Sequence, residues 1–260
     1  MSTLTTDDGT TIAYTDHGGD GPPTLLVHGI TESSAQWDPI VPMLSDRRVV
    51  TMDLRGHGAS GTADRYDLEA MAGDVVAVMA ELGVLGATHL VGHSLGGVVV
   101  SAVGAAAPVA SVVNVDQPLA LDGFKAQLAP IEAMLKDPAQ FDAAIDAVFT
   151  GMVGDMLSSA ERDRVNGLRR ADQTVVLGVW ELVFSMTEAE LAEVVAAALA
   201  GYAGVDVPYL SLHGIDPGDA YGDWLAGYIA GCQYEVWPDH GHYPHLVDPD
   251  RFVARLRDFW

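Results

Sequence analysis

The chain has 260 residues, of which 49% are hydrophobic and 19% are charged. This composition argues against disorder and is sufficient for one α/β domain that carries an insertion. Thirteen Lys and Arg against 36 Asp and Glu give a formal net charge of −23, and such a field repels nucleic-acid phosphates and anionic lipid surfaces. We therefore expect no nucleic-acid partner and no membrane partner. The single cysteine, Cys232, excludes an intrachain disulfide.

The amino-terminal residues contain no basic start followed by an apolar run, and no stretch approaches the length of a membrane span. We therefore expect a soluble cytoplasmic protein. The oligomeric state is not readable from the sequence.

Short β-branched runs alternate with longer helical stretches along most of the chain, which is typical of a mostly parallel, doubly wound sheet. The first two runs flank a turn at Asp7-Asp8-Gly9 and predict a hairpin. Helices are expected at 66–82, with Asp67 as N-cap, at 95–107 and at 252–260. The eight expected strands are 3–6, 11–15, 24–27, 49–52, 89–91, 109–115, 209–212 and 234–237.

The alternation stops between residues 118 and 205, where helical segments follow one another without a strand signal. We expect a helical cap at 118–205, inserted into an α/β core made of 1–117 and 206–260. The expected segments are 124–135, 141–149, 161–170 and 188–199. Six apolar side chains fit either a lid over a site or the insertion's own small core: Met152, Met156, Leu157, Trp180, Phe184 and Met186.

A G-x-S-x-G pattern stands between an expected strand and an expected helix, at Gly92-His93-Ser94-Leu95-Gly96. In this context the sharp turn exposes the serine hydroxyl, and larger residues in place of the glycines would collide with neighbouring elements. Ser94 is therefore the candidate nucleophile. A turn without chemistry remains the alternative, but the strand and the small-residue helix around it argue against that interpretation.

A serine hydroxyl needs a base to take its proton. His242 follows the last expected strand, in the loop Asp239-His240-Gly241-His242-Tyr243-Pro244-His245, and is the best candidate. His240 and His245 compete with it by proximity alone. The H-x-H-x-x-H spacing also fits a metal cluster, but no second group of ligands supports a metal. His93 is expected to pack or to form local hydrogen bonds.

The base in turn needs a carboxylate that fixes its tautomer. Two aspartates follow expected strands between Ser94 and His242, namely Asp116 and Asp216. The pattern alone does not separate them. The backbone N–H groups of Ile30, after an early strand, and of Leu95 are placed to form an oxyanion hole. Trp37 and Trp180 are candidate pocket walls, although both also fit a plain core.

Four segments together resemble the α/β-hydrolase fold superfamily: His28-Gly29, Asp53 to Ser60, Gly92 to Gly97 and Gly241-His242. The resemblance covers residues from about 10 to 116 and 206 to 260. It implies Ser94 as nucleophile, His242 as base, and Ile30 and Leu95 as oxyanion donors. It also implies that the loop 53–60 and His28 are structural, and that 118–205 corresponds to the family's variable cap.

The chain departs from most of these relatives at the acid. They place it three residues after the glycine that corresponds to Gly214, and Pro217 stands there in this sequence. The turn is similar to that of haloalkane dehalogenases whose acid lies after the preceding strand, a relocation that zearalenone-type lactone hydrolases share. We therefore expect Asp116 as the acid, with Asp216 as the alternative. A serine followed by Leu95 argues against halide displacement and for ester chemistry.

The expected function is hydrolysis of an ester or lactone of a mostly hydrophobic small molecule, through an acyl-enzyme and without a metal or organic cofactor. Alternatives on the same triad are perhydrolysis and carbon–carbon bond hydrolysis. A small-molecule receptor that turns over its ligand very slowly is a further alternative. Substrate identity is not encoded in any pattern of the sequence.

Overall fold

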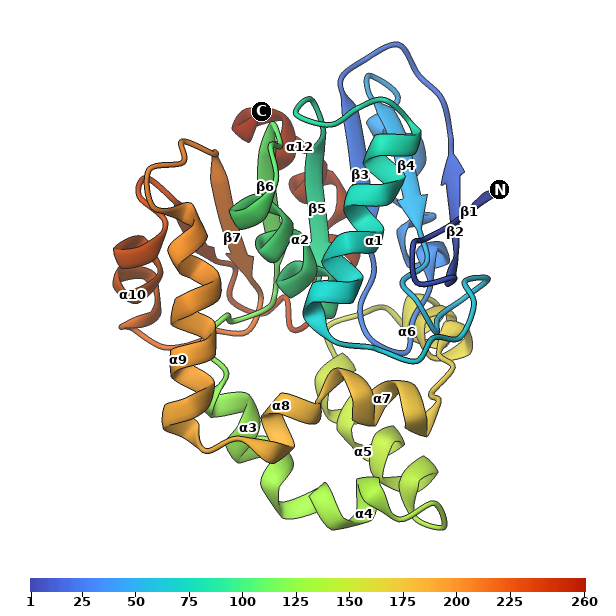
Figure 1. The fold of residues 1–260 in the computed structure, drawn as a ribbon, viewed down its shortest axis with the longest axis vertical. Helices are drawn as coiled ribbons and strands as arrows, with labels where there is room; N and C mark the ends of the chain where they lie inside the picture. Colours follow the sequence, from blue (N-terminus) through green and yellow to red (C-terminus); the bar gives the residue numbers. More distant parts are fainter.

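The computed structural model describes residues 1–260 and contains one eight-stranded sheet with helices on both faces (Figure 1). The strand order is β1-β2-β4-β3-β5-β6-β7-β8. Only the pairings of β1 with β2 and of β2 with β4 are antiparallel. The predicted mostly parallel, eight-stranded architecture is therefore confirmed. The strands are β1 Ser2–Thr5, β2 Thr11–Asp16, β3 Pro23–Val27, β4 Arg48–Met52, β5 His89–His93, β6 Ser111–Val115, β7 Tyr209–His213 and β8 Gln233–Val236.

Two core clusters lie on the opposite faces of the sheet. The larger packs α1 (Leu68–Glu81), α2 (Leu95–Ala106) and α10 (Tyr221–Tyr228) against one face. The smaller packs two 3-10 helices, η1 (Ser34–Trp37) and η2 (Val41–Leu44), together with α12 (Pro249–Phe259) against the other. Because apolar side chains pack against both faces of the sheet, the carboxyl ends of the parallel strands are held in fixed positions.

The ends of two core helices follow from local chemistry. Asp67 caps α1 as expected, because its carboxylate accepts a hydrogen bond from the backbone of Ala70 at 3.0 Å. Helix α2 lies close to the sheet because it carries glycines. A Cβ at Gly97 would stand 2.3 Å from Asn114 Oδ1 on β6. Helix α10 and the short α11 (Pro244–Val247) were not expected from the sequence.

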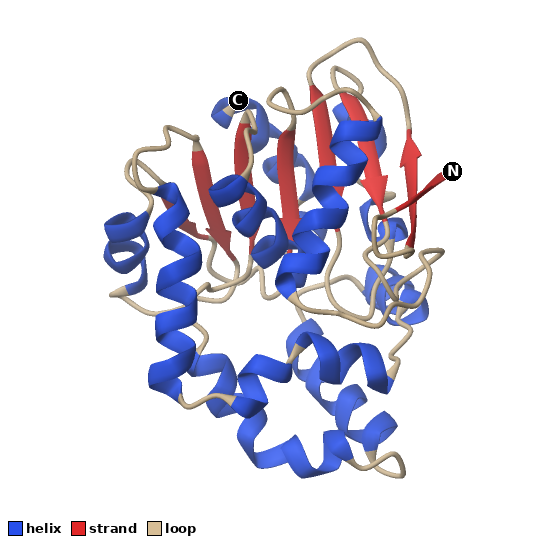
Figure 2. Cartoon of the chain, in the orientation of Figure 1, coloured by secondary structure: helices blue, strands red, loops and turns tan.

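The chain between the adjacent strands β6 and β7 consists of helices and connecting loops and contains no strand (Figure 2). Most of these helices lie beyond the carboxyl ends of the parallel strands, whereas α9 runs back beside α2 (Figure 1). The division into a core and a separate cap at residues 118–205 stays a prediction. The helices are α3 Asp122–Leu128, η3 Ala129–Ile131, α4 Glu132–Lys136, α5 Phe141–Val153, α6 Ser159–Leu168, α7 Gln173–Val179, α8 Glu181–Ser185, α9 Glu188–Leu199 and η4 Ala200–Tyr202.

No helix of the chain combines the length and the apolarity needed to cross a bilayer.

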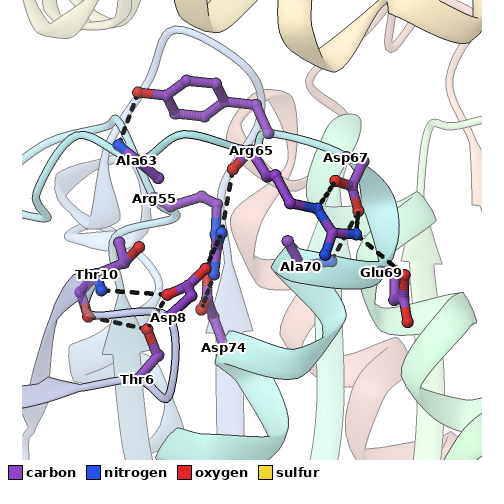
Figure 3. A network of polar contacts seen from close by, with 11 residues as sticks. Thr6, Asp8, Thr10, Arg55, Ala63, Arg65, Asp67, Glu69, Ala70 and Asp74 are labelled. Atoms are coloured by element: carbon purple, nitrogen blue, oxygen red, sulfur yellow. Dashed lines mark hydrogen bonds and ion pairs between the residues drawn. The ribbon is translucent and has the colours of Figure 1, made fainter.

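A buried ion pair fastens the loop after β4 to helix α1 and to the first hairpin (Figure 3). The guanidinium of Arg55 donates two hydrogen bonds of 2.7 Å to Asp74 and one of 2.9 Å to Asp8. The side chains of Arg55 and Asp74 are only 2% and 1% exposed. Since a buried charge without its partner is strongly unfavourable, this pair ties three segments of the chain together.

We predict that Asp74→Asn lowers the free energy of unfolding by about 3 kcal/mol, because Arg55 then stays buried with only Asp8 as counter-charge. Urea titration followed by circular dichroism measures this difference. Glu69→Gln, which removes the exposed partner of Arg65, is the control and is expected to cost less than about 1 kcal/mol. Equal losses in the two variants would contradict the prediction.

Candidate active site

The parallel register brings three loops to one edge of the sheet. Backbone pairing continues past the strand ends, because Ser94 N donates to Val115 O at 3.0 Å and Asp116 N donates to Leu212 O at 2.7 Å. The residues that follow β5, β6 and β7 are therefore neighbours in space. The inserted helices lie at the same edge (Figure 1).

Ser94 occupies a sharp turn between β5 and α2, with φ 51° and ψ −121°. A residue with a side chain rarely adopts positive φ, so this backbone is strained. The turn closes only with small neighbours. A Cβ at Gly92 would stand 2.0 Å from Gly96 O, and one at Gly96 would stand 2.3 Å from Val27 O. Both glycines of the G-x-S-x-G pattern are thus required by close backbone contact.

Asp116 and His242 form a hydrogen-bonded pair at this edge. His242 Nδ1–H donates to Asp116 Oδ2 at 2.6 Å, and both residues are buried. The other carboxylate oxygen accepts from the backbone N–H groups of Gly214 (2.7 Å) and Ile215 (2.9 Å). Burial raises the pKa of Asp116, but the contacts with His242 and Ile215 outweigh it and hold the pKa below its ordinary value. Asp116 is therefore a carboxylate at neutral pH.

The alternative acid, Asp216, lies in an exposed turn and makes no hydrogen bond to His242. Its Oδ1 accepts from the backbone of Gly218 at 2.8 Å. Between the two aspartates that the sequence leaves open, Asp116 is the one that the structure brings to His242.

The three histidines of the last loop lie in different surroundings. His240 hydrogen-bonds to Pro238 O at 2.9 Å and is partly exposed, whereas His245 is fully buried with its ring 4.8 Å from that of Trp37. No group of three or more His, Cys, Asp or Glu side chains has an arrangement that would hold a metal ion.

Two backbone N–H groups near Ser94 have no acceptor within the chain. Leu95 is the first residue of α2, where an N–H has no partner inside the helix, and Ile30 N makes no hydrogen bond. Gly29 lies so close to its neighbours that a side chain there would crowd them. A Cβ there would stand 3.2 Å from Ser94 Cβ, 3.3 Å from His93 Nδ1 and 3.0 Å from Glu32 Oε2. Two backbone N–H groups without an acceptor near the serine are suited to stabilise an oxygen anion.

All four residues other than glycine with positive φ lie in the loops that surround this edge. They are Thr31 (φ 65°), Ser94 (51°), Asp116 (53°) and Asp239 (64°). Backbone strain of this kind costs on the order of 1–3 kcal/mol per residue and concentrates at functional sites. From the sequence, strain is expected only at Ser94. The other three are Thr and Asp residues, for which no sequence pattern indicates a left-handed backbone.

Two other histidines hold these loops. His28 binds Gly29 O at 2.7 Å and accepts from Leu54 N at 3.0 Å, so its ring joins the loops after β3 and β4. His93 was expected to pack or to form local hydrogen bonds. Its ring packs against those of His242, Tyr243 and His245. Its Nε2–H also donates to the backbone oxygen of His242 at 2.7 Å, a contact that is not local. Because 149 positions separate the two residues, no pattern in the sequence indicates this contact.

The two candidate pocket tryptophans lie in different places. Trp37 is fully buried in the smaller core cluster, on the sheet face covered by η1, η2 and α12, where it lies between His245 and Phe252. Trp180 is in a cluster that joins the inserted helices to Ile30, where its ring contacts Phe124 and Phe184. Ser94 itself is 9% exposed, so access to it in this conformation is narrow.

Two buried polar residues beside this site, Glu32 and Tyr243, were not expected from the sequence. The Tyr243 hydroxyl donates to Glu32 Oε1 at 2.6 Å, although the residues are 211 positions apart. Glu32 follows Ile30 by two positions and Tyr243 follows His242 directly. Adjacency in sequence to Ile30 and His242 was the only signal available for them. Polar residues in loops are ordinarily exposed to solvent, so their burial was not expected.

Comparisons with known proteins agree with this architecture. The profile of the alpha/beta hydrolase family matches residues 24–255, and the chain therefore belongs to that family. A bifunctional esterase/perhydrolase from Acinetobacter calcoaceticus is 45% identical over 101 residues, which are 37% of this chain and 36% of that protein. The match thus spans only about a third of this relative's length.

Two solved structures extend the similarity to nearly the whole chain. An esterase from Rhodococcus is 28% identical, with a TM-score of 0.69, and the match covers 99% of this chain and 97% of that one. An enzyme described as cleaving the ring of the Pseudomonas quinolone signal has a TM-score of 0.81 at 20% identity, with 99% and 98% covered. At that identity the second likeness concerns the fold.

We predict that His213, at the end of β7, makes stability depend on pH between 6.5 and 4. Burial lowers its pKa from 6.5 to about 4, against the opposing effect of Asp116. The unfolded chain takes up the proton as the pH falls below 6.5, whereas the folded chain does not until about 4. The stabilisation is therefore complete above pH 6.5, and about 3 kcal/mol is lost on reaching pH 4.

Urea titrations at a series of pH values test this. His213→Gln should reduce the slope of the dependence in that window without abolishing it, because glutamine can still bond to Ser211 but does not titrate. His57 and His89, whose pKa values burial also lowers to about 4, keep their share of the slope. His240→Gln, at a partly exposed histidine, should leave the dependence unchanged. An unchanged slope in His213→Gln would contradict the assignment.

Proposed function

We propose that the protein is a serine hydrolase that cleaves a carboxylic ester or lactone of a mostly hydrophobic small molecule. The observation that carries this proposal is the 2.6 Å hydrogen bond from His242 Nδ1 to Asp116. It stands at the sheet edge that also carries the strained turn of Ser94. Membership of the alpha/beta hydrolase family and the esterase relatives support the same chemistry.

In the first half of the reaction, Ser94 Oγ attacks the carbonyl carbon while its proton passes to His242 Nε2. Asp116, which binds Nδ1–H, stabilises the imidazolium that forms. The oxygen anion of the tetrahedral intermediate accepts hydrogen bonds from the N–H groups of Ile30 and Leu95. Collapse of the intermediate breaks the bond to the alcohol oxygen, which takes the proton from His242. A lactone alcohol stays attached to the acyl group.

In the second half, His242 removes a proton from water, whose oxygen attacks the acyl carbon. The second intermediate returns the electron pair to Ser94 Oγ, which regains the proton, and the carboxylic acid leaves. Each proton that His242 accepts is therefore given back within the same half-reaction, and the cycle closes without an external reagent. This is the general triad scheme applied to the contacts of this chain.

The character of the substrate follows from the surroundings of the site. The cluster of inserted helices that contacts Ile30 is apolar and aromatic, with Trp180 in it. The net charge of −23 disfavours an anionic substrate. We therefore propose a neutral, hydrophobic ester or lactone, with the inserted helices as a cap and Trp180 at the pocket wall. Trp37 is enclosed in the core and is not part of this wall.

Perhydrolysis is the second candidate, because the Acinetobacter relative is described as a bifunctional esterase/perhydrolase. In that reaction hydrogen peroxide replaces water as the attacking species on the acyl-enzyme. A halogenation assay with peroxide and a carboxylic acid separates it from simple hydrolysis. A slow receptor would instead show saturable ligand binding with almost no steady-state turnover.

Our first prediction for this function is that a fluorophosphonate adds once to the wild-type protein and not to Ser94→Ala, because only an activated serine reacts. Intact-mass spectrometry measures the adduct. Ser159→Ala, at an exposed serine of α6, is the matched control and should be labelled like the wild type. A folded wild-type protein without an adduct would contradict an activated Ser94 and favour the receptor.

The second prediction separates the two candidate acids. Asp116→Asn should lower kcat/KM by a factor on the order of 10⁴, because the amide no longer favours the correct tautomer of His242. Asp216→Asn should change it by less than about threefold, since the asparagine oxygen can still accept from Gly218. Steady-state assays with an activated ester measure both. A large loss in Asp216→Asn alone would reverse the assignment.

A further inference from the structure

Glu32 is a buried carboxylate that the proposed triad does not use. It is 4% exposed and follows β3 in the loop that carries Ile30. Its Oε1 accepts a hydrogen bond of 2.6 Å from the hydroxyl of Tyr243. Its Oε2 has no hydrogen-bond partner and lies 3.7 Å from His93 Nδ1. Because burying a carboxylate is unfavourable unless it is paired, these contacts require an explanation.

The contacts of Glu32 converge on the loop of the proposed base. Tyr243 directly follows His242, is 1% exposed, and has its ring 4.8 Å from that of His93. His93 in turn donates from Nε2 to the backbone oxygen of His242 at 2.7 Å. Two consecutive residues of the loop are therefore held, one by its side chain and one by its backbone. The partners that hold them come from the loop after β3 and from the end of β5.

The inserted segment also binds Tyr243 and the loop of Glu32. Arg169, in the turn after α6, donates to the Tyr243 hydroxyl at 3.3 Å, and the next backbone N–H, of Arg170, donates to Thr31 O at 2.8 Å. Burial raises the pKa of Glu32, but His93 and Tyr243 outweigh it and lower the pKa to about 2. The carboxylate is thus charged at neutral pH, and a hydrogen bond to a charged acceptor is stronger than one to a neutral acceptor.

We propose that Glu32 is a positioning residue which, through Tyr243, fixes His242 relative to the loop that carries the Ile30 N–H. This inference rests on the proposed function of Ser94 and His242. Glu32 and Ile30 belong to one short loop, and Tyr243 and His242 are adjacent. The Glu32–Tyr243 hydrogen bond therefore sets the distance between the oxyanion donor and the base, two groups that must act on the same carbonyl.

The test compares Glu32→Gln, Tyr243→Phe and the double variant in steady-state ester hydrolysis. Glutamine keeps the shape and an acceptor for Tyr243 but removes the charge. We expect each single variant to lower kcat on the order of 10- to 100-fold with KM within twofold, because small displacements of reacting groups reduce rate more than binding. The double variant should be no slower than the slower single variant, since both changes break one connection.

Two matched controls accompany these variants. Glu132→Gln alters an exposed ion pair on α4, and Tyr202→Phe removes a buried hydroxyl that bonds to Ser101 O at 2.8 Å. Both should keep kcat within about twofold of the wild type. Melting temperature is measured for every variant. A Glu32→Gln protein that melts lower but retains wild-type kcat would show a structural role only and overturn the proposal, as would additive losses in the double variant.

A substrate-free readout separates this proposal from the proposed function. The proton that His242 Nδ1 shares with Asp116 gives a downfield proton NMR signal, which should shift or broaden in Glu32→Gln and Tyr243→Phe but not in Glu132→Gln. An unchanged signal in both site variants would overturn the positioning role. Failure of the wild type to react with fluorophosphonate would overturn the hydrolase function instead, without altering what the NMR signal reports.

Discussion

The carboxylate of Asp116 is the contact on which the arrangement of the site depends. Its three hydrogen bonds reach the backbone after β7 and the imidazole after β8, while its own backbone N–H pairs with Leu212 on β7. A single buried charge thus joins the ends of three neighbouring strands. The charge is tolerated in the interior because donors surround it on every side, so the loops and the carboxylate stabilise one another.

The sheet was predictable because each strand and each helix between the strands has its own local pattern of apolar residues. The run Val112 to Val115 is apolar except for Asn114 and is buried throughout, as a strand covered on both faces must be, and the helices between the strands show helical periodicity. Helix α10 was missed for the opposite reason. Its sequence carries two glycines and an aspartate, and it is held by tertiary contacts of Tyr221 and Leu225 with the core rather than by intrinsic preference.

The candidate site was predictable to the extent that it consists of local motifs. Gly92 to Gly96 is indicated by the G-x-S-x-G pattern, and His242 by its position after the last expected strand. The strand pattern alone left the choice between Asp116 and Asp216 open, because both aspartates follow strands. The family resemblance around Pro217 favoured Asp116, and His242 is hydrogen-bonded to that residue. Glu32 was unpredictable in principle, since its partners lie at the end of β5 and in the loop after β8. Pairings across such distances leave no periodic signal in one sequence.

The route by which the chain leaves the core has a mechanical consequence. Just after Asp116, Asn114 Nδ2 donates to Gln117 O at 2.7 Å, and Leu119 N donates to the Tyr221 hydroxyl at 3.0 Å. The backbone is thus anchored twice before α3 begins at Asp122. Any hinge of the inserted helices on this side must lie beyond Leu119, and rotation about it leaves the carboxylate stationary. Helices of a different length or shape could therefore follow Leu119 without moving Asp116, whereas the contact of Arg169 with Tyr243 would change with them.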